Sequence, residues 1–283
     1  MIFFVVLVHV LPLFADSTAS SDLRALPDLS STDLSATDSS NGSRLQQANK
    51  ATNNEANNQA LLNVPKKSAE EVVEKSFTVV LDPGHPSENG NGCTGFGLKE
   101  FEINFEIAVE VKKILEQQPN IKVLFTKNEV NELVKNIQRA EIANNARADL
   151  LFRIHCDSGS GSGYALYYPD SQGTKDGKTG PSAEVIYKSR QAVEKIHSGI
   201  FSVLEGKLRD NGIKTDRQTF IGKKQGALTG SIFSQVPLVT IEMIFLSSKN
   251  DADFIRSLEG KKLMSQAIAS GILHTALSEK SAR

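Results

Sequence analysis

Phe77-Thr-Val-Val-Leu-Asp-Pro-Gly-His85 carries the clearest structural signal in this sequence. Its first five residues are almost wholly apolar, and Asp-Pro-Gly then breaks the run with a turn. A short apolar run that stops at a turn is typical of a buried strand, as in a parallel sheet. We therefore expect a folded domain to begin at Phe77, with a histidine just beyond the carboxyl end of its first strand.

Downstream of this strand, predicted helices and strands alternate. Ile103, Ile107 and Val111 recur at helical spacing within residues 99–118, and Pro119-Asn120 ends that pattern. Apolar runs predict further strands at 121–126, 150–155, 163–168 and 238–243, and helical patterns occupy 136–148, 183–209, 251–258 and 261–277. Such alternation requires crossover connections. We predict a single α/β domain, residues 77–283, whose twisted, mostly parallel central sheet is covered by helices on both faces.

The first 76 residues have a different texture. Residues 1–15 form an apolar run that is too short for a spanning helix, which needs ~20 residues, but that suits a secretory signal peptide. No Lys or Arg precedes the run, and a buried N-terminal strand is the alternative. Residues 16–76 are rich in Ser, Asn, Asp, Gln and Thr, a composition that predicts a disordered polar linker. We expect an exported protein, either periplasmic or secreted.

Composition excludes some partners. The formal net charge is −1, so no overall basic field attracts nucleic acid or anionic lipid. No other stretch could insert stably into a membrane, and we expect a monomer. The two cysteines, Cys93 and Cys156, do not make a disulfide scaffold. We expect two unpaired thiols, with a bridge between them as the alternative.

Polar residues interrupt or follow three of the predicted strands. His85 and His155 lie at strand ends, and Glu242 lies inside an apolar strand. Glu100 begins a helix after the glycine-rich loop 89–97 and could point back to the same edge. Ligand sites in α/β sheets form outside the carboxyl ends of the strands. Two histidines and one carboxylate, with a fourth position open for water, are a catalytic zinc arrangement.

Each of these residues also has a plainer explanation. A histidine at a strand end is often only hydrogen-bonded, and a glutamate at a helix start favours the helix dipole. Glu242 is harder to explain in this way, because an unpaired carboxylate in an apolar strand is costly. With zinc nearby, Glu242 could take a proton from water and deliver it to a leaving nitrogen.

The order of these motifs along the chain adds a family resemblance. The motifs are Leu81-Asp-Pro-Gly-His85, Gly97-Leu-Lys-Glu100, Arg139-Ala-Glu-Ile-Ala-Asn144, Ala148-Asp-Leu-Leu-Phe-Arg-Ile-His-Cys-Asp157 and Pro237-Leu-Val-Thr-Ile-Glu-Met-Ile-Phe-Leu-Ser247. Together they closely resemble the zinc-dependent N-acetylmuramoyl-L-alanine amidases of the type-3 family. The resemblance spans about residues 77–277.

The resemblance implies a function and a set of site residues. It places His85, Glu100 and His155 on the zinc ligands of the family and Glu242 on its catalytic glutamate. The expected reaction is hydrolysis of the amide between N-acetylmuramic acid and L-alanine in peptidoglycan, for wall remodelling or daughter-cell separation. Another zinc peptidase or amidohydrolase of the wall, or an inactive peptidoglycan-binding domain, is the alternative.

The sequence departs from the family at two places beside these residues. Pro86-Ser87 follows the first histidine, where the family usually has glycines, and proline predicts a stiffer loop. Ile244 replaces a glycine after Glu242, which predicts added bulk near the site. We expect an active enzyme with altered substrate contacts.

Other polar residues are candidates for supporting roles. Asp82 could cap or orient the loop that holds His85. Asp157 is a candidate for orienting a ligand, with a turn residue as the equal alternative. Arg139 could hold a substrate carboxylate, although a surface salt bridge on its helix is the stronger expectation. His197 and His274 are expected to be structural or exposed.

An activator protein is a further candidate partner. Some members of the family carry a helical insert that covers the zinc until an activator displaces it. The Gly-, Lys- and Asp-rich stretch 169–180, expected to be a solvated loop, is too short for such an insert. A contribution from residues 211–230 is left open.

Overall fold

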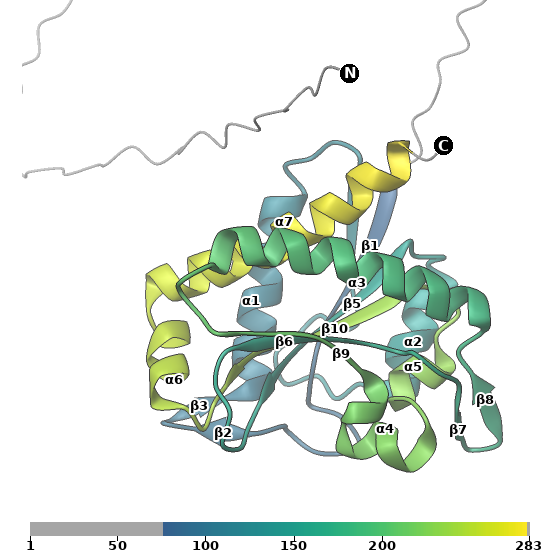
Figure 1. Ribbon diagram of the computed structural model, residues 1–283, viewed down its shortest axis with the longest axis horizontal. Helices are drawn as coiled ribbons and strands as arrows, with labels where there is room; N and C mark the ends of the chain where they lie inside the picture. Colours follow the sequence, from purple (N-terminus) through teal and green to yellow (C-terminus); the bar gives the residue numbers. More distant parts are fainter. Residues whose placement is uncertain (1–75, 282–283) are drawn as a thin grey trace, which may run out of the picture. The chain divides into compact units, whose positions relative to one another are not determined.

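The strand that begins at Phe77 lies inside a six-stranded sheet. The structure, a computed structural model, describes residues 76–281, and its sheet has the strand order β4-β1-β5-β10-β6-β9 (Figure 1). The expected signal at 1–15 and linker at 16–76 lie outside the described residues, apart from residue 76. The strands are β1 (Phe77–Pro83), β4 (Ile121–Phe125), β5 (Leu150–Asp157), β6 (Tyr164–Tyr168), β9 (Asp210–Thr215) and β10 (Leu238–Phe245).

The sheet is mostly parallel, as predicted. Strands β4, β1, β5 and β10 run in one direction, so their carboxyl ends meet at one edge. Strand β6 pairs antiparallel with β10, and β9 runs parallel to β6. The register places Glu242 opposite His155 and Asp82 opposite Arg153.

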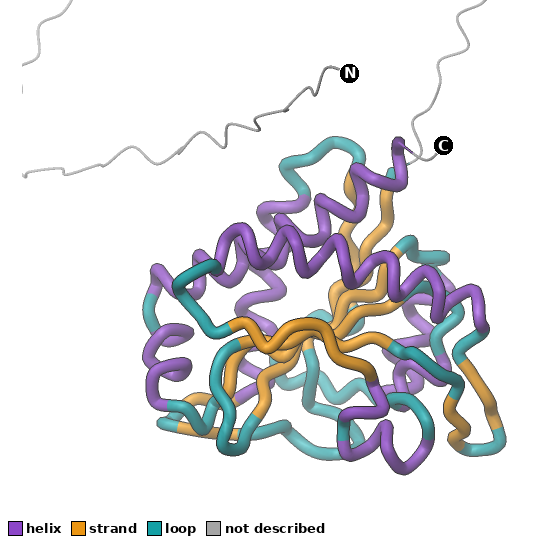
Figure 2. The backbone as a smooth tube through the Cα atoms, in the orientation of Figure 1, coloured by secondary structure: helices purple, strands orange, loops and turns teal. Residues whose placement is uncertain are grey.

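Helices cover both faces of this sheet (Figure 2). Helices α1, α3 and α7 pack on one face, where α3 and α7 lie side by side. Helix α2 packs on the other face with α5 beside it. The helices are α1 (Glu100–Leu115), α2 (Asn136–Asn145), α3 (Ala183–Leu204), α4 (Phe220–Gln225), α5 (Thr229–Phe233), α6 (Lys249–Arg256) and α7 (Leu258–Ser281).

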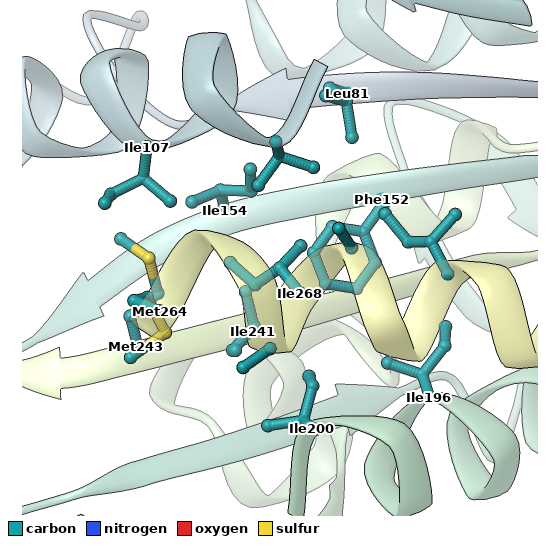
Figure 3. Packing of buried hydrophobic residues seen from close by; sticks show 14 of the residues in the cluster. Leu81, Ile107, Phe152, Ile154, Ile196, Ile200, Ile241, Met243, Met264 and Ile268 are labelled. Atoms are coloured by element: carbon teal, nitrogen blue, oxygen red, sulfur yellow. The ribbon is translucent and has the colours of Figure 1, made fainter. Parts of the chain in front are cut away.

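Strand alternation separates the core from the site. On β5, Phe152 and Ile154 point into the large hydrophobic cluster beneath α1, α3 and α7 (Figure 3). Leu151 points to the opposite face, into a smaller cluster against α2. Arg153 and His155 follow it on that second face, toward the carboxyl end of the strand. On this face, therefore, polar side chains follow the smaller hydrophobic cluster at the carboxyl end of the strand.

Several segments differ from the prediction. The helix predicted over 183–209 ends at Leu204, and Gly206 then adopts φ 71°, a conformation that favours glycine. Residues 210–215 form the edge strand β9, whose half-buried residues lack an alternating apolar pattern. The expected loop 169–180 contains the hairpin of β7 (Gly173–Lys175) and β8 (Lys178–Gly180). Residues 211–230 run through β9, a 3-10 turn (Asp216–Gln218), α4 and the start of α5.

A second small hairpin precedes α1. Within the glycine-rich loop, β2 (Thr94–Gly95) pairs with β3 (Leu98–Lys99), so the chain enters α1 directly from a strand. No helix in the described part of the chain combines the length and apolar character needed to cross a membrane.

Candidate metal centre and active site

Three potential metal ligands from three different elements meet at the carboxyl edge of the sheet. His85 follows β1, Glu100 is the first residue of α1, and His155 lies on β5. One ligand atom from each lies within 4.8 Å of the others. The structure therefore brings together the three residues that the sequence predicted as one ligand set.

The Glu100 carboxylate is buried and held by backbone donors. Its Oε2 accepts a hydrogen bond from the Cys93 N–H at 2.8 Å, and its Oε1 accepts one from the Cys156 N–H at 3.2 Å. Burial would raise the pKa of Glu100, but the hydrogen bond and charge of His155, with the charge of His85, lower that pKa to about 2. Glu100 is thus fixed in place as a carboxylate.

Both histidines direct a ring nitrogen toward this carboxylate. His85 Nδ1 lies 3.0 Å from the Gly90 carbonyl, which can only accept, so Nδ1 carries the proton. Its Nε2 faces Glu100 Oε1 at 3.6 Å and is the ring nitrogen left to bind a metal ion. His155 directs Nδ1 to Glu100 Oε1 at 3.0 Å, while burial lowers the pKa of His155 and favours the neutral ring.

These groups fit a bound cation. His155 Nε2 is buried and has no hydrogen-bond partner among the described residues. Such orphaned atoms are rare in folded proteins, because each costs free energy unless a partner is supplied. Two neutral imidazoles and one carboxylate are also the donor set that zinc takes in catalytic sites. The residues present therefore suit a metal ion.

Glu242 lies next to this ligand set on the same face of the sheet. It pairs in register with His155 on the neighbouring strand. Its Oε2 is buried without a hydrogen-bond partner in the described part of the chain. Burial raises the pKa of Glu242 well above its usual range, and the charges of Glu100 and Asp157 raise it further. A carboxyl group in this state can both accept and donate a proton.

A buried ion-pair network lies behind His85. Asp82 is fully buried, and its Oδ1 accepts from Arg139 at 2.6 Å while its Oδ2 accepts from Arg153 at 2.9 Å. Thr126 donates a further hydrogen bond to Oδ1 at 2.6 Å. Burial would raise the pKa of Asp82, but the two guanidinium groups hold that pKa well below its usual range. Asp82 is therefore the counter-ion of two buried arginines.

Through Arg139 this network reaches the loop that carries His85. Arg139 donates to the carbonyls of Pro83 and Pro86, each at 2.8 Å, and Lys127 donates to the carbonyl of His85 itself. His85 has φ 56°, an unfavourable region for a residue with a side chain. The hydrogen bonds of Arg139 and Lys127 hold the loop in this conformation.

This arrangement corrects the expectation for Arg139. Its side chain is 1% exposed, so it neither forms a surface salt bridge nor is open to substrate. Periodicity alone did not show which face of α2 would be buried. Asp82 does lie where it can orient the His85 loop, through Arg139. Asp157 accepts a hydrogen bond from Ser158 N–H at 2.7 Å, as a turn residue would, and its charge acts on Glu242.

Some residues around the site were not singled out from the sequence. Arg153 pairs with Asp82 and with Asn136, and Lys127 supports His85. Asn104, one turn after Glu100, donates to the carbonyl of Gly84 at 3.2 Å. A cation inside the apolar run 150–155 was the available signal for Arg153. Nothing in the local sequence marks Lys127 as buried.

The two cysteines, the two departures from the family pattern and the two remaining histidines of the domain all lie outside the proposed ligand set. Cys93 and Cys156 are free thiols, as expected. Pro86 is buried after a cis peptide bond, and Ile244 is buried in the large hydrophobic cluster, so its bulk enters the core. His197 forms a hydrogen bond with Asp210 at 2.8 Å, and His274 is exposed, both in line with structural or surface roles.

Comparison with known proteins gives a consistent family match. The family model described as N-acetylmuramoyl-L-alanine amidase matches residues 79–274. The uncharacterized protein YqiI of Bacillus subtilis is 31% identical over 216 residues, which cover 75% of this chain and 91% of YqiI. The N-acetylmuramoyl-L-alanine amidase LytC of Bacillus subtilis is 28% identical over 197 residues, which cover 69% of this chain.

The match covers only part of some relatives. The aligned region is 34% of the length of LytC and 35% of a Bacillus anthracis protein named as an uncharacterized cell wall amidase. Among solved structures, the amidase AmiC2 of Nostoc punctiforme superimposes with a TM-score of 0.56 at 24% identity, over 73% of this chain and 98% of that chain. The likeness to this structure supports the α/β fold described above.

Proposed function

The chain belongs to the N-acetylmuramoyl-L-alanine amidase family, and on this premise we propose that it hydrolyses the amide between N-acetylmuramic acid and L-alanine in peptidoglycan. The observation that carries the proposal is the ligand set of His85, Glu100 and His155 within 4.8 Å, with the unpartnered carboxyl group of Glu242 on the neighbouring strand. An amide is unreactive toward water, so its hydrolysis needs both an activated nucleophile and a proton donor for the leaving nitrogen.

In this proposal His85, Glu100 and His155 hold a zinc ion. When bound, zinc supplies Lewis-acid polarisation of the scissile carbonyl and lowers the pKa of water to ~7. Glu100 is the anionic ligand, and the Cys93 and Cys156 amides fix its two oxygens. The Gly90 carbonyl fixes the tautomer of His85, so that Nε2 is left to bind.

Glu242 is the proposed general base and acid. Its ionised form accepts a proton from the attacking water at a carboxylate oxygen. The protonated form then delivers that proton to the nitrogen of L-alanine as the carbon–nitrogen bond breaks. The burial that raises the pKa of Glu242 supports the first half of this cycle, because a more basic carboxylate takes the proton more readily.

The substrate of this reaction lies outside the cytoplasmic membrane. We therefore also propose that the protein acts in the periplasm or after release from the cell, as the apolar run at residues 1–15 suggests. Cell fractionation with an antibody against the folded domain tests this location. Retention of the full chain in the cytoplasm would contradict it.

The reaction is tested on purified peptidoglycan. The purified chain should contain about one zinc ion, and it should release intact stem peptides that carry a free L-alanine amine, with glycan strands stripped of peptide. Shortened peptides would instead identify a peptidase. Wall binding without soluble product and without bound metal would identify an inactive binding domain. Activity of the chain alone also tests whether it needs an activator.

Replacing Glu242 separates catalysis from metal binding. Glu242→Gln should retain the zinc ion and lose activity by about 10²- to 10⁴-fold, because the amide cannot transfer the proton. Metal analysis and release of L-alanine amine are the two measurements. Glu205→Gln, an exposed glutamate beyond α3, is the matched control and should behave like the wild type. Full activity of Glu242→Gln would refute the assigned base.

A further inference from the structure

Lys214 presents a positive charge on the same face of the sheet as Glu242. It lies on β9, where it pairs with Tyr167 of β6, and Tyr167 pairs in turn with Thr240 of β10. Thr240 and Glu242 are two residues apart on β10, so their side chains share a face. Lys214, Tyr167 and Glu242 therefore all lie on the face that carries His155.

The Lys214 ammonium has a ring contact but no anionic partner within ion-pairing distance among the described residues. Its Nζ lies 5.6 Å from the centre of the Tyr167 ring, and the side chain is only half-buried. A ring holds an ammonium group weakly and leaves its hydrogen-bond donors free. Burial and nearby carboxylates raise the pKa of Tyr167 to about 12, so the phenol is a neutral neighbour. The Tyr167 ring thus positions the Lys214 ammonium group, and its positive charge is left available for an anionic ligand.

Lys214 lies two strands away from Glu242. Two strand spacings of ~4.8 Å and two residues of ~3.3 Å separate the two backbone positions, or ~12 Å along the diagonal. Consecutive Cα atoms of a peptide are ~3.8 Å apart, so a stem peptide that extends from the scissile amide toward β9 brings its next residue toward the long side chain of Lys214.

Charge makes this position selective. Asp157 and Glu242 are acidic residues at the site, and their charges interact. An anionic peptide group on this face is favoured where a cation such as Lys214 faces it. We propose that Lys214 binds the carboxylate of the stem-peptide residue that follows L-alanine, and so favours walls in which this group is free over walls in which it is amidated. This inference rests on the proposed function.

The test compares two peptidoglycan preparations. They differ in whether the α-carboxyl group of the second stem residue, a glutamate, is free or amidated. The rate of stem-peptide release is measured at low substrate concentration for the zinc-loaded full chain. The wild type should release peptide about tenfold faster from the carboxylate wall, since a charge-assisted hydrogen bond contributes about this factor.

Three variants separate substrate binding from other roles of Lys214. Lys214→Met should remove the preference by slowing release from the carboxylate wall alone, and Lys214→Arg should keep it. Lys223→Met removes an exposed lysine on α4 and should leave both rates unchanged. The melting temperature of each variant verifies that it is folded.

The results distinguish a failure of the proposed role of Lys214 from a failure of the amidase proposal. A wild type that cleaves both walls equally overturns the role of Lys214, without reference to any variant. Equal slowing on both walls in Lys214→Met also overturns it, and indicates instead that Lys214 acts on the ionisation of Glu242. A wild type that releases no stem peptide from either wall contradicts the amidase proposal itself.

Discussion

The position of the Glu100 side chain depends on a glycine beside it. Gly92 has φ +78°, and a Cβ added there would lie 2.3 Å from Glu100 Oε2 and 2.8 Å from His85 Cδ2. Gly97 in the same loop has φ +79°, but a Cβ there would meet no heavy atom within 4 Å. The two glycines thus share one backbone conformation and differ in what surrounds them. Substitutions at these two glycines therefore distinguish backbone strain from steric contact with the proposed metal ligands.

Substitution of these two glycines gives a prediction at the residue scale. Gly92→Ala and Gly97→Ala should cost a similar ~1–2 kcal/mol in backbone strain. Gly92→Ala should in addition weaken zinc binding by tenfold or more, because Glu100 and His85 must move. Zinc affinity measured by competition with a chromophoric chelator gives the comparison. Equal zinc affinities of the two variants would show that the close contacts at Gly92 do not matter.

Three elements are joined beneath the site by one carboxylate. Asp82 on β1 pairs with Arg153 on β5 and with Arg139 on α2. Arg139 continues to the carbonyls of the loop that begins at Pro83. A buried ion pair adds little stability over an apolar substitute, but removal of one partner strands a buried charge. Loss of the Asp82 carboxylate therefore matters mainly because it leaves two buried arginines without a counter-ion.

Removal of this carboxylate gives a prediction at the element scale. Asp82→Asn should lower the free energy of unfolding by about 3–5 kcal/mol, because Arg139 and Arg153 lose their counter-ion. Urea unfolding near pH 7 measures the change. Asp176→Asn is the control, since Asp176 is an exposed residue between β7 and β8, and it should unfold like the wild type. A variant Asp82→Asn as stable as the wild type would contradict the structural role.

The same residue predicts a dependence of stability on pH. The pKa of Asp82 is depressed in the folded state, so its contribution is fully present above the unfolded pKa of ~3.9. That contribution is lost as the pH falls from there toward the folded pKa. Between pH 5 and pH 2 the wild type should thus lose more unfolding free energy than Asp82→Asn. Parallel pH profiles for the two proteins would rule out this contribution.

The site as a whole is assembled from distant parts of the chain. His85 comes from the loop after β1, and Glu100, His155 and Glu242 come from α1, β5 and β10, so no single segment holds more than one of them. Nε2 of His85 and Nδ1 of His155 both face Glu100 Oε1, at 3.6 Å and 3.0 Å. A metal ion that binds only the assembled site stabilises the folded state by mass action.

Metal removal therefore gives a prediction at the scale of the molecule. At a free zinc concentration of 100 Kd the stabilisation is about 2.7 kcal/mol, which for a domain of this size raises Tm by roughly 5–10 °C. Chelation should lower the Tm of the wild type by this amount. Glu100→Gln, which loses the anionic ligand, should melt at nearly the same temperature with and without chelator. An equal effect of chelation on both proteins would place the metal elsewhere.

The mostly parallel sheet and the grouping of the proposed metal ligands followed largely from the sequence. Apolar runs such as 77–81 and 150–155 are long enough to mark buried strands, and parallel strands place their ends at one edge. His85, Glu100, His155 and Glu242 could be grouped because motifs of a known family spaced them along the chain. These signals are local or depend on the order of motifs along the chain, so they can be recognised in the sequence alone.

The positions of β9, Lys127 and Arg139 depended on contacts between distant segments. Strand β9 is a half-buried edge strand, so its sequence shows no alternation, and it forms because β6 offers an unpaired edge. Arg139 was expected in a salt bridge on the helix surface, and nothing in the local sequence marks Lys127 as buried. They are buried because the carbonyls of the His85 loop and the carboxylate of Asp82 supply partners. Burial of a charge is decided by such partners, and only folding brings them into reach.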